Sequence, residues 1–251
     1  MAWHGSEPVN DPSIETVGMD SLIVRLFDSI DEENMPWMLA ADQALRAAFG
    51  EALIDLVPSY TTLLVHYDIE CLDLQAARAR VSDALKGLTP ATSGEGQRHV
   101  IPVWYDVSVG PELERIAERL GVSPEEVSAR HCARDYSVFA LGFAPGYAFM
   151  GRLDDELATP RLKTPRQKVA AGSVAIAERQ TAVYPTLSPG GWNIVGRTPV
   201  ALFGRDREGY SLFRPGDKVR FEAISREAFI EQGGDPTPLA ERGDTPTEAQ
   251  T

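Results

Sequence analysis

The sequence predicts an α+β protein in which a small α/β sandwich precedes a β-barrel. Three observations support this prediction. Residues 17–86 alternate between β-branched runs and segments whose apolar residues recur at helical spacing. A stretch at residues 87–98 has no large apolar side chain after Leu88. The chain beyond it holds many short apolar runs separated by glycine and proline, which is typical of a closed or nearly closed barrel.

The expected sandwich at residues 17–86 follows a polar lead, residues 1–16, that we expect to be flexible. Its order is strand, helix, strand, strand, helix, with the helices on one face of the sheet. These elements are expected at residues 21–27, 34–49, 54–57, 61–67 and 73–85. The first helix is indicated by Asn34 as cap, Pro36 in the first turn and Gly50 as stop.

Residues 87–98 form the predicted linker to a barrel domain at residues 99–232. A strand at 99–105 leads to a short helix at 111–120 and a second helix begun by Ser123. The remaining strands are expected at residues 136–143, 174–177, 181–184, 192–195, 200–203, 211–213 and 219–224.

After the last of these strands the chain offers one more helix signal and then loses its apolar character. Ser225 is expected to cap a final helical turn. Residues 233–251 contain no aromatic side chain, and we expect them to be a flexible tail.

The charge distribution favours a small anionic ligand. The net charge of −13 argues against nucleic acid or an anionic membrane as the partner. Between His131 and Phe203, however, eight arginines and lysines face five acids, so this stretch carries +3 and the remainder −16. A basic island in an acidic chain is typical of a protein that binds a small anion.

Other classes of protein find no support in the sequence. The two cysteines lie far apart without CxxC spacing, and no metal-binding motif occurs, so neither a disulfide framework nor a metal site is predicted. No basic leader precedes an apolar core, and no apolar run approaches the ~18 residues of a membrane span. We therefore expect a cytoplasmic protein.

The basic island contains a loop with four cations and no acid between Arg161 and Lys168. Pro160 and Pro165 stiffen its backbone. Arg161 and Arg166 can each grip a carboxylate or phosphate through paired N–H donors. A solvated basic loop has the same composition, so the spacing alone leaves both interpretations open.

Further candidates lie on the same stretch. Gly190 and Gly191 expose successive amides that can bind an anion, or they form a tight turn. Side chains that can hydrogen bond to or stack on a ligand, with core packing as the alternative for the aromatic ones, are Gln180, Tyr184, Ser188, Trp192 and Arg197. His131, with an ordinary pKa near ~6.5, suits proton transfer; the alternative is a hydrogen-bonded packing histidine. We name His131 and Arg166 as candidate catalytic residues.

A series of motifs in fixed order carries a family resemblance. The motifs are Gly142–Tyr147, Thr159–Arg161, Thr164–Arg166, Ala171–Val174, Gln180–Pro185, Ser188–Trp192 and Gly196–Pro199. The chain resembles the family that includes the B subunit of 5-oxoprolinase, allophanate hydrolase subunit 1, the first half of the carboxyltransferase region of urea carboxylase, and the sporulation kinase inhibitor KipI. The resemblance covers all but the two ends of the chain.

The resemblance implies a cyclophilin-like barrel and a function. It implies a subunit, inactive alone, of a multi-component ATP-dependent amidohydrolase, most like the 5-oxoprolinase that converts 5-oxoproline to L-glutamate. The implied partner is a homologous larger barrel subunit encoded nearby, in a heterodimer or heterotetramer. The use of ATP is implied by the resemblance only, because the chain has no GxxxxGKS/T loop. Whether ATP binds to the complex or to this chain stays open.

Two alternatives remain. One is a KipI-like protein that docks on a histidine kinase; the other is a carboxyltransferase subunit of the urea carboxylase or allophanate hydrolase type. The sequence departs from the family pattern at Ala170, where proline is usual, and at Glu178 and Ala182, where glycine is common. These departures leave the particular substrate open.

Overall fold

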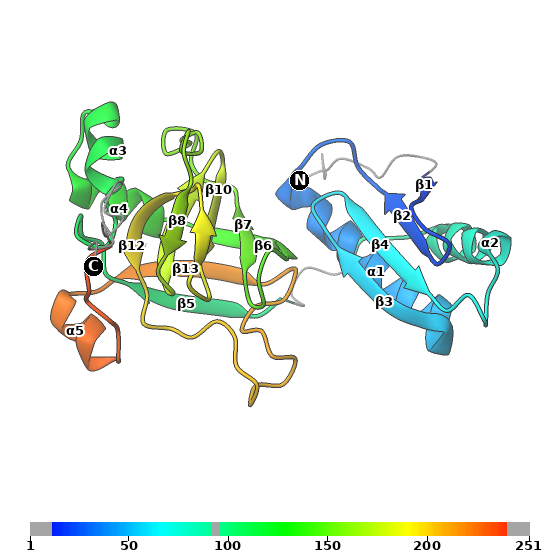
Figure 1. Cartoon of the computed structure of the whole chain (residues 1–251). Coiled ribbons are helices and arrows are strands. Elements are labelled where there is room, and N and C mark those ends of the chain that lie inside the picture. The colour runs from blue at the N-terminus through cyan, green and yellow to red at the C-terminus, as the bar shows by residue number, and fades with distance from the viewer. Residues whose placement is uncertain (1–11, 92–95, 240–251) are drawn as a thin grey trace, which may run out of the picture. The chain divides into compact units, whose positions relative to one another are not determined.

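The computed structural model describes residues 12–91 and 96–239, which form two compact units (Figure 1). One unit holds the described residues up to Gln97 with Ser137–Leu141 and Arg214–Asp217. The other holds Arg98–Tyr136, Gly142–Phe213 and the described residues from Lys218 to Leu239. Parts of the predicted lead, linker and tail, residues 1–11, 92–95 and 240–251, lie outside the described residues.

The first unit is a four-stranded antiparallel sheet covered by two helices. The strand order is β1 (Ser13–Thr16), β2 (Ser21–Arg25), β4 (Thr62–Tyr67) and β3 (Leu53–Pro58). The helices are α1 (Met35–Phe49) and α2 (Leu74–Leu85), with 3-10 turns at Glu32–Asn34 and Gly50–Ala52. The predicted order of elements is confirmed. Strand β1 was not predicted, and it lies in the lead that we expected to be flexible.

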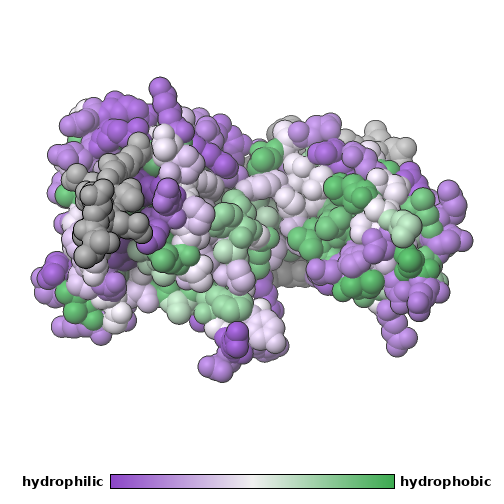
Figure 2. All heavy atoms as spheres, viewed as in Figure 1, coloured by the Kyte–Doolittle hydropathy of each residue, from purple (hydrophilic) through white to green (hydrophobic). Residues whose placement is uncertain are grey.

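Alternation of side chains along the strands explains why the helices cover one face. Leu22 and Val24 on β2 and Leu63 and Val65 on β4 are buried in one apolar core with α1 and α2. Residues between them point to the other face of the sheet, where Leu64 remains partly exposed. Figure 2 shows apolar surface over the strands of this unit.

A seven-stranded sheet that nearly closes has six of its strands in the second unit, and most of the seventh strand, β6, is the segment Ser137–Leu141 that was grouped above with the first unit. The strand order is β12 (Asn193–Arg197), β9 (Ser173–Ala177), β10 (Gln180–Val183), β7 (Ala148–Gly151), β6 (Asp135–Leu141), β13 (Lys218–Ala223) and β5 (Arg98–Val103). Beyond the end of β5, Trp104 and Arg197 exchange both backbone hydrogen bonds, at 2.8 and 2.9 Å. This bridge joins the two edges of the sheet and confirms the predicted barrel.

The expected strands at residues 200–203 and 211–213 are wrong, because this loop has only one isolated bridge, Phe203 to Ser211. Two short strands that we did not predict, β8 (Arg166–Val169) and β11 (Ser188–Gly190), pair as a separate two-stranded sheet. Neither has a strand signature. Strand β8 has no apolar alternation, and β11 is Ser-Pro-Gly, a composition that usually excludes strands.

Three helices and a terminal segment complete the second unit. Helices α3 (Leu113–Leu120) and α4 (Pro124–Cys132) pack on each other, α3 on β12 and α4 on β13. Ser123 caps α4 and Ser225 caps α5 (Arg226–Glu231), as predicted. The amide of Leu239 donates to the carbonyl of Ser108 at 2.8 Å, so part of the tail that we expected to be flexible is hydrogen bonded to this unit.

None of the helices in residues 12–91 and 96–239 has the length and apolar character needed to cross a bilayer.

The close approach of Gly110 to β12 provides a test of barrel packing. A Cβ at Gly110 would lie 2.3 Å from the carbonyl carbon of Val195. We therefore expect Gly110→Ala to lower the free energy of unfolding by roughly 1–3 kcal/mol in chemical denaturation, as overpacking does. The control is Gly204→Ala, which meets nothing within 4 Å and should stay within about 0.5 kcal/mol of wild type. Equal effects of the two substitutions would contradict this packing.

Candidate functional site

A cavity of about 250 Å³ lies in the second unit where three turns converge. It is lined by the turn at Phe143–Tyr147, the loop at 161–165 and the turn at 189–192. Five residues that we predicted from the sequence line it together: Arg161, Tyr184, Gly190, Gly191 and Trp192. The cavity is therefore the candidate site.

Aromatic rings form the walls of the cavity. Tyr147, Tyr184 and Trp192 are buried, and the Tyr147 ring meets Tyr184 edge-on at 5.4 Å and Trp192 edge-on at 6.1 Å between centroids. Phe149 packs on Tyr147 at 4.9 Å. Interlocked rings of this kind have few alternative rotamers, so they give the site a fixed shape.

The Tyr184 hydroxyl lies at the centre of this packing. Burial raises the pKa of Tyr184 above its ordinary value, although hydrogen bonds with the Trp192 backbone and the Tyr147 side chain act in the opposite direction. The phenol is neutral at physiological pH. A Cβ at Gly190 would lie 2.2 Å from the Tyr184 hydroxyl, so only glycine permits this approach. Gly190 therefore serves packing, which favours the tight-turn interpretation of this residue.

Among the described residues that line the cavity, Arg161 carries the positive charge. Its side chain is exposed, and its guanidinium carbon lies 5.7 Å from the centroid of the Trp192 ring. Within the described chain, no hydrogen bond or ion pair joins this guanidinium to another residue. The backbone on either side is fixed: the Asn193 side chain donates to the Pro160 carbonyl at 3.0 Å, and the Leu162 amide donates to the Gly191 carbonyl at 2.7 Å. Arg161 thus presents its charge to solvent from a loop whose backbone is held in place.

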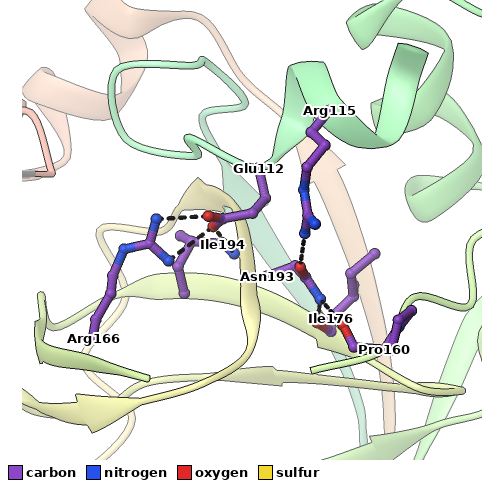
Figure 3. A network of polar contacts seen from close by, with 7 residues as sticks. All are labelled: Glu112, Arg115, Pro160, Arg166, Ile176, Asn193 and Ile194. Atoms are coloured by element: carbon purple, nitrogen blue, oxygen red, sulfur yellow. Dashed lines mark hydrogen bonds and ion pairs between the residues drawn. The ribbon is translucent and has the colours of Figure 1, made fainter. Parts of the chain in front are cut away.

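Arg166, a predicted catalytic residue, is buried in an ion pair with Glu112, unlike the exposed Arg161. Its two terminal nitrogens donate to the Glu112 carboxylate at 3.0 and 2.6 Å, and both side chains are buried (Figure 3). The same carboxylate accepts the Ile194 amide at 2.9 Å. This pair ties β8 to the start of α3 and to β12. Arg166 is not among the residues that line the cavity, and both of its terminal nitrogens are bonded to Glu112, so the structure favours a positioning role.

Asn193 is a second anchor beside this ion pair. Its amide nitrogen donates to the carbonyls of Pro160 and Ile176, each at 3.0 Å, and its oxygen accepts a hydrogen bond from Arg115 (Figure 3). The loop that carries Arg161 is therefore held at Pro160 by Asn193 and at Arg166 by Glu112.

His131, the other predicted catalytic residue, is buried inside the barrel and does not line the cavity. Its Nδ1 lies 2.6 Å from the Tyr105 hydroxyl and its Nε2 lies 2.9 Å from the Thr181 hydroxyl, and its ring stacks on Phe221 at 4.6 Å. Burial lowers the pKa of His131 from 6.5 to about 3. Both ring nitrogens are engaged, so the structure favours the packing alternative over proton transfer.

Three other predicted residues also lie away from the cavity lining. The Arg197 guanidinium is buried and donates to the carbonyls of Asp235 and Thr237 at 2.8 and 2.7 Å. Burial lowers the pKa of this group. Gln180 begins β10 opposite Ala177, and Ser188 pairs with Val169 on β8. These residues build the scaffold rather than the cavity wall.

Several residues of the site were not among the site residues predicted from the sequence: the anchoring residues Glu112 and Asn193, and lining residues such as Phe143, Tyr147 and Phe149. Glu112 directly precedes the apolar stripe of α3, where a glutamate is usually solvated, and its partner Arg166 is 54 residues away. A signal was available for Phe143 and Tyr147, which lie in the glycine- and proline-containing motif Gly142–Tyr147.

Comparison with solved structures first supports the fold. A nearly closed barrel with a small α/β unit is also the fold found in the Kluyveromyces lactis urea carboxylase structure. That likeness has a TM-score of 0.74 at 14% identity, covers 94% of this chain and 24% of that chain, and shows the fold alone.

The family follows from the sequence match. The carboxyltransferase domain family, subdomain C and D, matches residues 12–213, and the chain belongs to this family. The B subunit of 5-oxoprolinase from Bacillus subtilis is 35% identical over 228 residues, which cover 86% of this chain and 94% of that protein. The crystal structure of TTHA0988 is 38% identical with a TM-score of 0.73. That match covers 88% of the present chain but only 41% of the TTHA0988 chain.

The Glu112–Arg166 pair predicts a large and specific loss of stability. Glu112→Ala leaves a buried guanidinium without its carboxylate, and we expect the free energy of unfolding to fall by roughly 3–5 kcal/mol. The matched control is the exposed Glu114→Ala on the same helix, which should change it by less than about 0.5 kcal/mol. The double variant Glu112→Leu/Arg166→Met should recover much of the loss in denaturant titrations. A mild effect of Glu112→Ala would show that the pair is not needed.

The lowered pKa of His131 predicts acid sensitivity. The unfolded chain binds a proton on this ring below pH 6.5, whereas the folded chain does so only near pH 3. Stability from this group is therefore complete above pH 6.5 and falls as the pH drops toward 3, at up to ~1.4 kcal/mol per pH unit. His131→Gln, although destabilised at neutral pH, should show a shallower acid slope than wild type in unfolding titrations. An unchanged slope for His131→Gln would exclude this origin.

Proposed function

We propose that the chain is a subunit of a multi-component, ATP-dependent amidohydrolase most like 5-oxoprolinase, which opens 5-oxoproline to L-glutamate. The observation that carries the proposal is the match to the B subunit of the Bacillus subtilis 5-oxoprolinase, which extends over 94% of that protein. The proposed partner is a homologous larger barrel subunit, and the proposed location is the cytoplasm.

The chemistry of the cavity supports this choice of substrate. 5-Oxoproline is a compact lactam ring with one carboxylate. The aromatic walls suit the flat face of the ring, and the exposed Arg161 guanidinium suits the carboxylate. A volume of about 250 Å³ lies below the ~300–1,000 Å³ typical of sites for drug-sized ligands, so the cavity suits a small molecule better than a nucleotide. We therefore assign ATP to the assembled complex rather than to this cavity.

The lining of the cavity also supports action within a complex. The described residues that line it include no serine, cysteine, histidine or acid. The acid–base groups among them are the phenols of Tyr147 and Tyr184, and burial raises the pKa of Tyr184. What this chain supplies is binding and orientation: a cation for the carboxylate and walls for the ring. Phosphoryl transfer to an amide depends on such positioned charges more than on a nucleophilic side chain of the enzyme. We propose that the partner supplies the other groups that the reaction needs.

A second candidate function is inhibition of a histidine kinase by docking of the barrel surface. Exposed Phe143, Leu187 and Phe203 favour it, since large apolar side chains at a surface often mark contact sites. Kinase autophosphorylation measured with and without the protein separates this function from the first. Inhibition that survives Arg161→Ala would support docking. Dependence of activity on a biotin carrier would instead indicate a carboxyltransferase of the urea carboxylase type.

Reconstitution tests the first function. The chain is combined with the products of its neighbouring genes, and ATP hydrolysis is measured with and without 5-oxoproline. We expect stimulation by 5-oxoproline only in the complete set. Arg161→Ala should raise the KM for 5-oxoproline roughly tenfold or more with a smaller change in kcat, because it removes a charged hydrogen bond to the substrate.

The matched control is Lys163→Ala, an exposed cation two residues along the same loop, which should leave the KM unchanged. Absence of 5-oxoproline-dependent hydrolysis in the complete set would refute the function. A KM that is equally insensitive to both substitutions would remove Arg161 from the site.

A further inference from the structure

Phe143 has a backbone conformation that a bulky residue rarely adopts. Its φ is 71°, in the left-handed region that favours glycine. The side chain is 63% exposed, yet it lines the cavity. Strained residues of this kind persist when the surrounding structure holds them, and they gather at ligand sites.

Hydrogen bonds and close contacts of the surrounding turn hold Phe143 in this backbone conformation. The Ala144 amide donates to the Gly142 carbonyl at 2.9 Å, and the Gly142 amide donates to the Tyr147 carbonyl at 3.1 Å. Gly146, at φ 83°, closes the turn against Phe203: a Cβ there would lie 2.9 Å from the Phe203 Cβ. The strained conformation is thus imposed by short local contacts.

Burial of the Phe143 ring does not explain the strain. The ring contacts its neighbours in T-shaped geometry without parallel stacking: the centroid distances are 5.1 Å to Tyr147 and 6.4 Å to Tyr184, at interplanar angles of 67° and 89°. A packing residue would be hidden from water, whereas Phe143 remains largely accessible. It is therefore available to a flat group that enters the cavity.

We propose that Phe143 is a specificity-determining residue that covers a small, flat, ring-bearing carboxylate in the cavity. The ligand ring lies in the cavity against the accessible side of Phe143, while its carboxylate pairs with Arg161. The proposal rests on the proposed function for the identity of the ligand, 5-oxoproline. It adds that recognition depends on the ring face presented by Phe143 as well as on the charge.

Calorimetric titration of the full chain with 5-oxoproline tests the proposal, with 2-pyrrolidinone, the same lactam ring without a carboxylate, as the comparison ligand. Wild type should bind 5-oxoproline more tightly than 2-pyrrolidinone. Phe143→Gly should weaken 5-oxoproline binding about five- to tenfold, because it removes the stacking face. Since glycine accepts φ 71° without strain, the same variant should melt at the wild-type temperature or about 2–4 °C above it.

Tyr210 provides a matched control. It is also an exposed aromatic residue at positive φ, 62°, but it does not line the cavity. Tyr210→Gly should likewise keep or raise the melting temperature, and it should leave binding unchanged. Wild-type affinity in Phe143→Gly, lack of 5-oxoproline binding by the wild-type chain, or a lower melting temperature of Phe143→Gly would each overturn the proposal.

The outcomes separate this proposal from the proposed function. If the reconstituted set does not hydrolyse ATP but 5-oxoproline still binds and loses affinity in Phe143→Gly, the function fails and the role of Phe143 stands. If the set is active and Phe143→Gly leaves both the KM and the affinity unchanged, the function stands and the role of Phe143 fails.

Discussion

The buried ion pair of Glu112 and Arg166 is the constraint on which the site depends. Two charges withdrawn from water are tolerated when they are paired and well hydrogen bonded, and here the carboxylate accepts from both terminal guanidinium nitrogens and from the Ile194 amide. The pair fixes where β8 begins relative to β12 and α3. It also fixes the end of the loop that presents Arg161, which Asn193 holds at the other end through Pro160.

The two arginines of this loop, Arg161 and Arg166, therefore have different roles. Arg166 is buried and its charge stabilises the scaffold, whereas Arg161 is exposed beside Trp192 and its charge remains available to a ligand. Between them, Leu162 donates its amide to Gly191 and joins the loop to the turn that forms the far wall of the cavity. A rigid aromatic cavity with the Arg161 cation at its wall suits recognition of a small anionic ring, and the reacting groups would have to come from elsewhere in a complex.

Elements whose signals are local were predicted well. Helix α1, with its proline start and Gly50 stop, and the caps at Ser123 and Ser225 depend on neighbours within four residues, so the sequence reveals them directly. Strands β8 and β11 were missed because their pairing comes from contacts distant in sequence. The same reason explains Arg166: the glutamate that distinguishes it from Arg161 lies far away in the chain. For His131, burial inside the closed barrel could not be foreseen from a residue that lies near the end of a helix.

Amide hydrogen exchange in a Glu112→Gln variant tests this dependence most directly. The Ile194 amide is bonded to Glu112 itself, whereas the Leu162 amide is bonded to Gly191 and depends on Glu112 only through the held loop. If the ion pair holds the site, exchange should accelerate at both amides, while the Tyr67 amide, which donates to the Asp20 carbonyl at 2.9 Å in the first unit, keeps its protection. Acceleration at Ile194 alone, with Leu162 as protected as in wild type, would contradict the account.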